Sequence, residues 1–356
     1  MSSTNAQNSK GLNPCEVFLS DYQYKGYHPL NDKIILYSDN YEKNYFAAQF
    51  IPYAPGNQDQ EPNFYFNREI ALYKQVNEDN LPFVPLVKYI PPTPEYEGLI
   101  FTKFMRGSSL MHQIKIQKTA NQPSKSTTYS LLNLEKIDSP FDDFEDDFSD
   151  HPIKASKSII IEDFKYNNAN KMINIYGISV AVSVLQKLNI MHRDIRPENI
   201  LLDENCKPYL SDFGLARKVI GKQQMSGIRG TSPYIALEMF TEERKADISS
   251  DIFSLGVTMI MILQGEVTIN DDSGRAVNAY TLKQLKLVKL LRQKKYNLPT
   301  NIPESLNNLI DRCLNVDPDQ RPKIGDILDV LVNDQVIAFG GNEYKEYIEE
   351  MRSKLQ

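Results

Sequence analysis

The sequence lacks the features that mark several classes of protein. Its 356 residues include no tryptophan and only three cysteines, which lie far apart and form no C-x-x-C pair (Cys15, Cys206 and Cys313). This pattern argues against a disulfide framework or a zinc site and suits a reducing compartment. Residues 1–14 have no apolar core of a signal peptide, and the most apolar run, 255–263, is too short to span a bilayer. We expect no membrane partner and a cytoplasmic location, with the nucleus as the alternative.

Negative charge is concentrated in one segment. The chain has a net charge of −6 at pH 7, and residues 138–150 hold seven carboxylates and no basic residue, so the remainder is nearly neutral. An acidic chain is poorly suited to nucleic acid, which we do not expect as a partner. Phenylalanines interleave with these carboxylates. A solvated loop is the usual interpretation of such a segment. The alternative is a docking segment that folds on a basic partner, with its phenylalanines as anchors.

Hydrophobic periodicity predicts a small lobe rich in strands and a larger helical lobe. Short β-rich runs at 33–38, 45–51 and 99–104 surround one helical segment at 64–76. Beyond residue 107, apolar residues recur at helical spacing. Later helices are expected over 249–264, 281–293, 303–315, 324–333 and 342–355. The fold class is therefore α+β.

This pattern also predicts the order of the domains. We expect a disordered tail over 1–14, one domain over 15–333, and a C-terminal tail over 334–356 that contains a helix. The small lobe occupies about 15–104 and the large lobe about 105–333. Residues 115–164 are polar and then acidic, so we interpret them as an insertion loop in the large lobe.

Two motifs in the large lobe carry chemistry. Residues 191–202 read MHRDIRPENILL and residues 209–219 read YLSDFGLARKV. Each triplet alone occurs by chance, but here H-R-D, the asparagine five residues after its aspartate, and D-F-G occur in order after apolar runs. They resemble the catalytic loop and metal-binding motif of the eukaryotic protein kinases. Gly214 would let the backbone approach the site closely.

This resemblance covers about residues 20–333 and implies a bilobal protein-kinase-like fold, with ATP and Mg²⁺ as cofactors and a protein as substrate. It implies that Asp194 orients the acceptor hydroxyl and that Asn199 and Asp212 bind Mg²⁺. Arg196 would contact the γ-phosphate in place of the family's lysine. The Pro-Glu-Asn ending of the catalytic loop favours Ser/Thr over Tyr as acceptor.

Further landmarks of the resemblance follow downstream. Thr231 is similar to a residue of the segment that closes the activation loop, and it also favours Ser/Thr. Glu238 and Arg321 resemble a glutamate–arginine pair of the family, which implies that their side chains pair. Phe253 stands where the family usually has tryptophan.

The small lobe departs from the family pattern. In the family, a strand lysine binds the α- and β-phosphates and pairs with a helix glutamate. Here the matching residues are Gln49 and Glu69, so the cation is missing. Of the glycine-rich loop only Gly26 remains. The with-no-lysine kinases resemble this arrangement and take a lysine from the neighbouring strand, where Lys33 stands within one residue of the required register. The other interpretation of Lys33 is a solvated residue at a strand edge.

Two functions from different classes fit these observations. The first is an ATP-dependent protein serine/threonine kinase, which the intact catalytic-loop motifs favour. The alternative is a pseudokinase, an interaction module on the same fold with weak or no phosphotransfer, which the missing lysine and glycines favour. The same fold can serve either function, so the site must decide between them.

Overall fold

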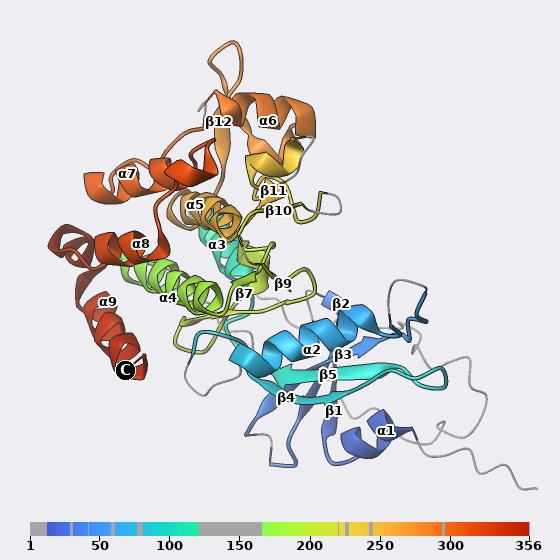
Figure 1. Ribbon diagram of the computed structural model, residues 1–356. Coiled ribbons are helices and arrows are strands. Elements are labelled where there is room, and N and C mark those ends of the chain that lie inside the picture. The colour runs from blue at the N-terminus through green and yellow to red at the C-terminus, as the bar shows by residue number, and fades with distance from the viewer. Residues whose placement is uncertain are drawn as a thin grey trace, which may run out of the picture. The chain divides into compact units, whose positions relative to one another are not determined.

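A computed structural model defines the fold of the chain. It describes residues 13–28, 31–41, 43–57, 61–76, 81–120, 166–219, 221–224, 228–241, 245–293 and 296–355. The chain divides into two compact units (Figure 1). The first contains the described parts of 1–66 and 86–104, and the second those of 67–85, 105–124 and 161–356. The acidic segment 138–150 lies outside the described residues.

One antiparallel sheet forms the centre of the first unit. Its strand order is β1-β2-β3-β5-β4. The strands span Gln23–His28 (β1), Asn31–Ser38 (β2), Tyr45–Ile51 (β3), Leu86–Ile90 (β4) and Gly98–Lys103 (β5). Alternation along β3 divides the side chains between the two faces: Phe46 and Ala48 join one apolar cluster, while Tyr45 and Ala47 join the other. This alternation fixes which face each strand residue presents.

A short helix covers one face of this sheet. Helix α1 (Pro14–Leu19) begins after Asn13, whose side chain accepts the backbone N–H of Cys15 at 3.0 Å. Cys15 and Leu19 pack with Leu99 and Phe101 of β5. The sequence did not predict α1, because a six-residue helix has little periodicity and depends on tertiary contacts.

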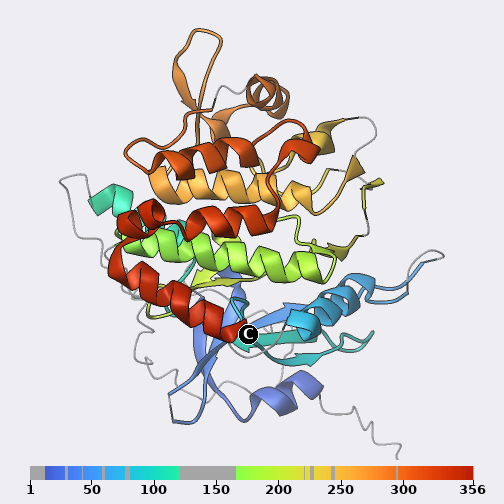
Figure 2. The same cartoon turned by 60° about the vertical axis from the view of Figure 1, so that its left-hand side comes forward.

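The second unit is mainly helical. Its helices are most of α2 (Phe64–Val76), α3 (Leu110–Ala120), α4 (Asn168–Lys187), α5 (Ser249–Gln264), α6 (Gln284–Arg292), α7 (Glu304–Cys313), α8 (Ile324–Leu331) and α9 (Asp334–Lys354). Its 3-10 turns are η1 (Pro197–Asn199), η2 (Leu237–Phe240), η3 (Ala279–Thr281) and η4 (Pro318–Gln320). Figure 2 shows α4 lying beside α8 and α9, and residues of α4 are in contact with both of these helices and with α5.

Short strand pairs connect the helices. They are β6 (Ile190–Met191) with β9 (Arg217–Lys218), β7 (Ile200–Leu202) with β8 (Pro208–Leu210), β10 (Gln223–Gln224) with β11 (Lys245–Ala246), and β12 (Thr268–Asn270) with β13 (Ala276–Asn278). The first two pairs flank the motifs singled out in the sequence. Buried side chains fill most of α4 and α5, which form the core beneath these motifs.

Helices α2 and α5 and strand β3 have the bounds expected from periodicity. Helix α3 continues to Ala120, past the residue near which the insertion was expected to start. Gln117 within that helix donates from its side-chain amide to the backbone oxygen of Tyr166 at 2.8 Å.

In the part of the chain that the structure describes, no helix has both the length and the apolar composition needed to cross a bilayer.

Candidate active site

A buried aspartate of α5 holds the start of the catalytic loop. Asp251 accepts the backbone N–H of His192 at 2.7 Å and that of Arg193 at 2.9 Å, one with each carboxylate oxygen. Arg193 has a positive φ of 71°, so the chain turns sharply just before Asp194. Burial raises the pKa of Asp251, although His192 and the two N–H groups oppose the rise. The sequence predicted only a helix over 249–264, which contains Asp251. The hydrogen-bond partners of Asp251 lie 58 and 59 residues away from it in the sequence.

The loop then places Asp194 against Asn199. The amide nitrogen of Asn199 donates to the backbone oxygen of Asp194 at 2.9 Å and to its Oδ2 at 2.8 Å. Oδ1 of Asp194 is buried and has no hydrogen-bond partner among the described residues. A buried acceptor without a donor is costly to maintain. Oδ1 is therefore an atom that can still accept a hydrogen bond.

Asn199 also connects the catalytic loop to Asp212. Its backbone oxygen accepts two hydrogen bonds from Ser211, from the N–H and from the hydroxyl, both at 2.9 Å. Asp212 follows directly and has a positive φ of 63°. Its Oδ1 accepts the N–H of Gly214 at 3.1 Å. The residue with left-handed backbone in this turn is thus Asp212. At Gly214 the constraint is space, because a Cβ there would lie 3.1 Å from Oδ1 of Asp212 and a larger residue would crowd the carboxylate.

Phe213 fixes the turn from inside. Its side chain is fully buried and its ring packs edge-on against Tyr73 of α2, with centroids 4.8 Å apart. His192 lies on another side at 5.3 Å. The aromatic contacts therefore connect α2, the D-F-G turn and the catalytic loop within the second unit.

Glu69 of α2 lies near the same turn. A Cβ at Gly214 would be 3.9 Å from Oε2 of Glu69, and Arg68 donates to the backbone oxygen of Gly214 at 2.6 Å. Desolvation and the Asp212 carboxylate raise the pKa of Glu69 to about 7, although Arg68 opposes this. The carboxylates of Glu69 and Asp212 repel each other, and a cation bound between them would reduce this repulsion.

Arg196 is engaged within its own loop. Its Nε donates to Oε2 of Glu198 at 2.9 Å, and its Nη2 pairs with Oε1 at 2.7 Å. The remaining nitrogen, Nη1, donates to the hydroxyl of Thr231. This bidentate geometry is one that a lysine could not reproduce. Sequence reasoning had missed Glu198 as its partner.

The remaining predicted residues lie in the sheet of the first unit. Gly26 pairs with Leu36, and the exposed Gln49 pairs with Ile34. Lys33 precedes Ile34 and alternates to the side of Ile35, whose cluster includes α1 residues, whereas Ile34 packs in the opposite cluster. Lys33 is exposed, and it lies on the face of the sheet opposite to that of Gln49, which alternates with Ala47; both facts favour the solvated interpretation. Substitution of Lys33 tests the role in phosphate binding that the resemblance implies.

The oxygen atoms near Asp194 suit a hard cation. The side-chain amide of Asn199 uses its nitrogen on Asp194, so its carbonyl oxygen is the atom left for a metal ion. Asp212 contributes a carboxylate from the adjoining strand end. Amide and carboxylate oxygens are the ligands that Mg²⁺ prefers. Asn199 and Asp212 therefore fit the magnesium-binding role that the motifs imply.

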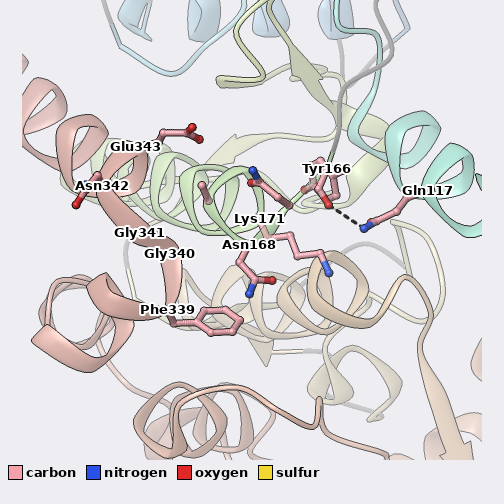
Figure 3. A pocket seen from close by; sticks show the side chains of 11 residues that line it. Gln117, Tyr166, Asn168, Lys171, Phe339, Gly340, Gly341, Asn342 and Glu343 are labelled. Atoms are coloured by element: carbon pink, nitrogen blue, oxygen red, sulfur yellow. Dashed lines mark hydrogen bonds between the residues drawn. The ribbon is translucent and has the colours of Figure 1, made fainter. Parts of the chain in front are cut away.

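A separate pocket of about 580 Å³ also lies in the second unit. Its lining comes from α3, the start of α4 and the region where α9 kinks at Gly341 (Figure 3). Lys171 reaches past this pocket to the backbone oxygen of Leu263 at 3.0 Å. None of the catalytic-loop residues lines it.

Comparison with known proteins agrees with this geometry. The model of the protein kinase domain matches residues 154–331, which is half of the chain. The chain belongs to the protein kinase family. The sheet of the first unit and the helical second unit correspond to the bilobal α+β fold of that family.

Curated relatives match part of this chain. It is 32% identical over 155 residues to 3-phosphoinositide-dependent protein kinase B of Dictyostelium discoideum, covering 42% of this chain and 16% of the relative. It is 32% identical over 160 residues to MAP kinase-activated protein kinase 2 of Drosophila melanogaster, covering 43% of each. It is 31% identical over 159 residues to CBL-interacting protein kinase 22 of rice, Oryza sativa subsp. japonica, covering 43% of this chain and 33% of the relative. The alignment thus spans less than half of each of these relatives.

Proposed function

We propose that the chain is an ATP-dependent protein serine/threonine kinase. The observation that carries the proposal is Asp194, whose Oδ2 is fixed by Asn199 while Oδ1 is buried and has no hydrogen-bond partner in the described part of the chain. A carboxylate held in one orientation with one free oxygen is suited to receive the proton of an acceptor hydroxyl. Two relatives from Saccharomyces cerevisiae, 33% and 30% identical over 42% and 41% of this chain, carry serine/threonine-protein kinase in their names, which supports the choice of acceptor.

The proposed reaction moves one phosphoryl group. The acceptor oxygen forms a bond to the γ-phosphorus of ATP, the bond from that phosphorus to the β–γ bridging oxygen breaks, and ADP leaves. Asp194 takes the hydroxyl proton. Mg²⁺ held by Asn199 and Asp212 would neutralise the charge of the phosphates, as the family generally requires. Arg196, oriented by Glu198, is the nearby cation proposed for the γ-phosphate.

A second candidate rests on Gln49. A neutral amide where the family has the strand lysine removes one cation from the phosphate site, and a charge-assisted contact of that kind contributes about 1.5–3 kcal/mol. This observation favours a pseudokinase that acts through binding partners. Protein substrates and any basic partner of residues 138–150 belong to these proposals.

Two measurements separate the candidates. ATP with Mg²⁺ should raise the thermal stability of a kinase, by about 2.7 kcal/mol when the ligand is at 100 times its Kd. Transfer of labelled phosphate to Ser/Thr peptides should then be lost in Asp194→Asn, while ATP binding persists, because the amide cannot take the proton. If the unmodified chain binds ATP and transfers nothing, including after activating phosphorylation, the pseudokinase is the correct function.

A further inference from the structure

The segment between α5 and α6 brings an exposed aromatic side chain beside the catalytic loop. Tyr280 lies in η3, directly after the β12–β13 hairpin, where the side chain of Asn278 accepts its N–H at 2.9 Å. Its hydroxyl hydrogen-bonds to that of Tyr234, and the two rings meet edge-on with centroids 6.1 Å apart. Tyr234 is only 1% exposed, whereas Tyr280 is 39% exposed. Tyr280 is therefore the solvent-facing member of this pair.

A series of contacts joins this pair to the catalytic aspartate. The N–H of Tyr234 donates to the backbone oxygen of Thr231 at 2.9 Å, and the Thr231 hydroxyl accepts from Arg196. At the neighbouring Gly230, a Cβ would lie 3.9 Å from Oδ1 of Asp194. These contacts link the ring of Tyr280 to the oxygen atom that the acceptor hydroxyl would reach.

The charges that act on the hydroxyl of Tyr280 are balanced. Burial raises the pKa of Tyr280, and the two charged groups that act on its hydroxyl are Glu198, which raises the pKa, and Arg196, which lowers it. Arg196 holds both oxygens of Glu198 in a bidentate pair, so the opposite charges cancel. A substrate arginine could reach Glu198 only by displacing Arg196. A cation stacked on the Tyr280 ring would also meet the repulsion of that guanidinium.

We propose that Tyr280 is a specificity-determining residue that selects an uncharged apolar or aromatic side chain next to the acceptor hydroxyl and disfavours lysine and arginine. The inference rests on the proposed kinase function and adds the class of peptide that the site accepts. An exposed ring beside a neutral pair offers apolar contact area but no net charge to attract a basic residue. The selection should act on KM, since Tyr280 lies outside the groups that move the proton.

A peptide library with one Ser or Thr acceptor and each flanking position varied in turn tests this. The unmodified chain should prefer Leu, Phe or Tyr over Arg and Lys at one flanking position. Tyr280→Phe keeps the ring and should keep that preference. Tyr280→Glu adds a carboxylate and should shift the preference towards Arg by about tenfold in kcat/KM, mainly through KM. Gln335→Glu, which adds the same charge at an exposed position of α9, should change neither activity nor preference.

The outcomes are distinct. A basic preference of the unmodified chain, or a Tyr280→Glu variant that folds, transfers phosphate and selects the same peptides, would overturn the inference and leave the proposed kinase function intact. Thermal unfolding of each variant shows whether it folds. If Tyr280→Glu is unstable, Tyr280→Gln replaces it and should lose the aromatic preference. No transfer by the unmodified chain to any peptide would overturn both proposals.

Discussion

Arg321 and Glu238 form a buried bidentate ion pair. Nη1 of Arg321 donates to Oε1 of Glu238 at 2.8 Å and Nη2 to Oε2 at 2.7 Å, and these side chains are 0% and 9% exposed. The hydroxyl of Ser250 donates to the same carboxylate at 2.6 Å, and the guanidinium lies 5.2 Å from the ring centroid of Phe253. The pair expected from the sequence is confirmed. It joins the end of the activation segment to the α7–α8 connection.

Breaking this pair should destabilise the folded chain strongly. Arg321→Ala leaves Glu238 buried without its partner, which typically costs about 3–5 kcal/mol. Arg321→Lys keeps a charge but loses the fork, so its cost should be intermediate. Urea unfolding of both variants measures the free energies. The double variant Arg321→Met with Glu238→Gln should lose less than the sum of the two single changes, because no charge is left unpaired. Losses below about 1 kcal/mol in Arg321→Ala would contradict a structural role for the pair.

The three cysteines should be inert in the folded chain. Burial raises the pKa of Cys15 to about 11 and those of Cys206 and Cys313 to about 12, from ordinary values near 9. The folded thiols therefore keep their protons where unfolded thiols ionise. Their contribution to stability is present below pH 9 and is lost as the pH rises from 9 towards 11–12.

Alkylation with iodoacetamide at pH 9 tests this prediction. The native chain should stay unlabelled, because the thiolate is the reactive form, and all three cysteines should be labelled once denaturant unfolds it. Mass spectrometry counts the labels. Rapid labelling of any one cysteine in the native chain would show that its surroundings are more open than the structure has them.

How far the sequence predicts this structure depends on the range of the interactions. Strand β3 and helix α5 follow from local periodicity, because their apolar faces repeat at a fixed spacing. The β12–β13 hairpin was not predicted. It has three residues in each strand, and its partner Tyr296 bridges to Ile269 from beyond α6. Such short strands depend on contacts that no local pattern records.

The same division applies to the site. Motif spacing predicted that Asp194, Asn199 and Asp212 belong to one site, and hydrogen bonds join them through Ser211. It did not predict that Arg196 would pair with Glu198, since two residues of one motif can each point to solvent or to the other. Nor did it predict Tyr280, whose partner Tyr234 lies 46 residues earlier. Both relationships depend on side-chain directions that are fixed only in the folded chain.

Phosphorylation of Ser226 should raise the proposed kinase activity. Ser226 lies outside the described residues and is the only hydroxyl residue between Gly214 and Gly230. Burial, together with the nearby Arg217, Arg229 and Arg68, lowers the pKa of Arg193 to about 10. A phosphate on Ser226 would be attracted to these positive charges and would accept charge-assisted hydrogen bonds from the guanidinium groups, which would order the activation segment.

Intact-mass analysis and kinase assays on the same samples test this prediction. Phosphatase treatment should lower activity, and Ser226→Ala should be equally low and insensitive to phosphatase. Arg193→Gln should abolish the difference between the treated and untreated chain. Full activity in material that carries no phosphate on Ser226 would exclude this form of activation.

Restoring the missing lysine should improve ATP binding. Gln49 is an exposed residue of β3 opposite Ile34, and the family places a lysine at this position. An ammonium there would supply the cation that the triphosphate lacks, so we expect Gln49→Lys to lower the Kd for ATP with Mg²⁺ by about tenfold, or about 1.4 kcal/mol. Isothermal titration measures the change, and Gln49→Met controls for the loss of the amide.

Two lysines of the first unit test whether the chain already has a substitute. Lys33 alternates with Ile35, whereas Gln49 alternates with Ala47 of the opposite cluster, so the two side chains lie on opposite faces of the sheet. We therefore expect Lys33→Met to bind ATP nearly as tightly as the unmodified chain. Lys43, whose N–H is bound by Asp39 in the turn before β3, provides the matched control. A tenfold loss in Lys33→Met alone, about 1.4 kcal/mol, would instead assign the phosphate cation to Lys33, as in the with-no-lysine kinases. If neither lysine matters and Gln49→Lys brings no gain, the first unit does not hold phosphates, and the pseudokinase becomes the better description of the chain.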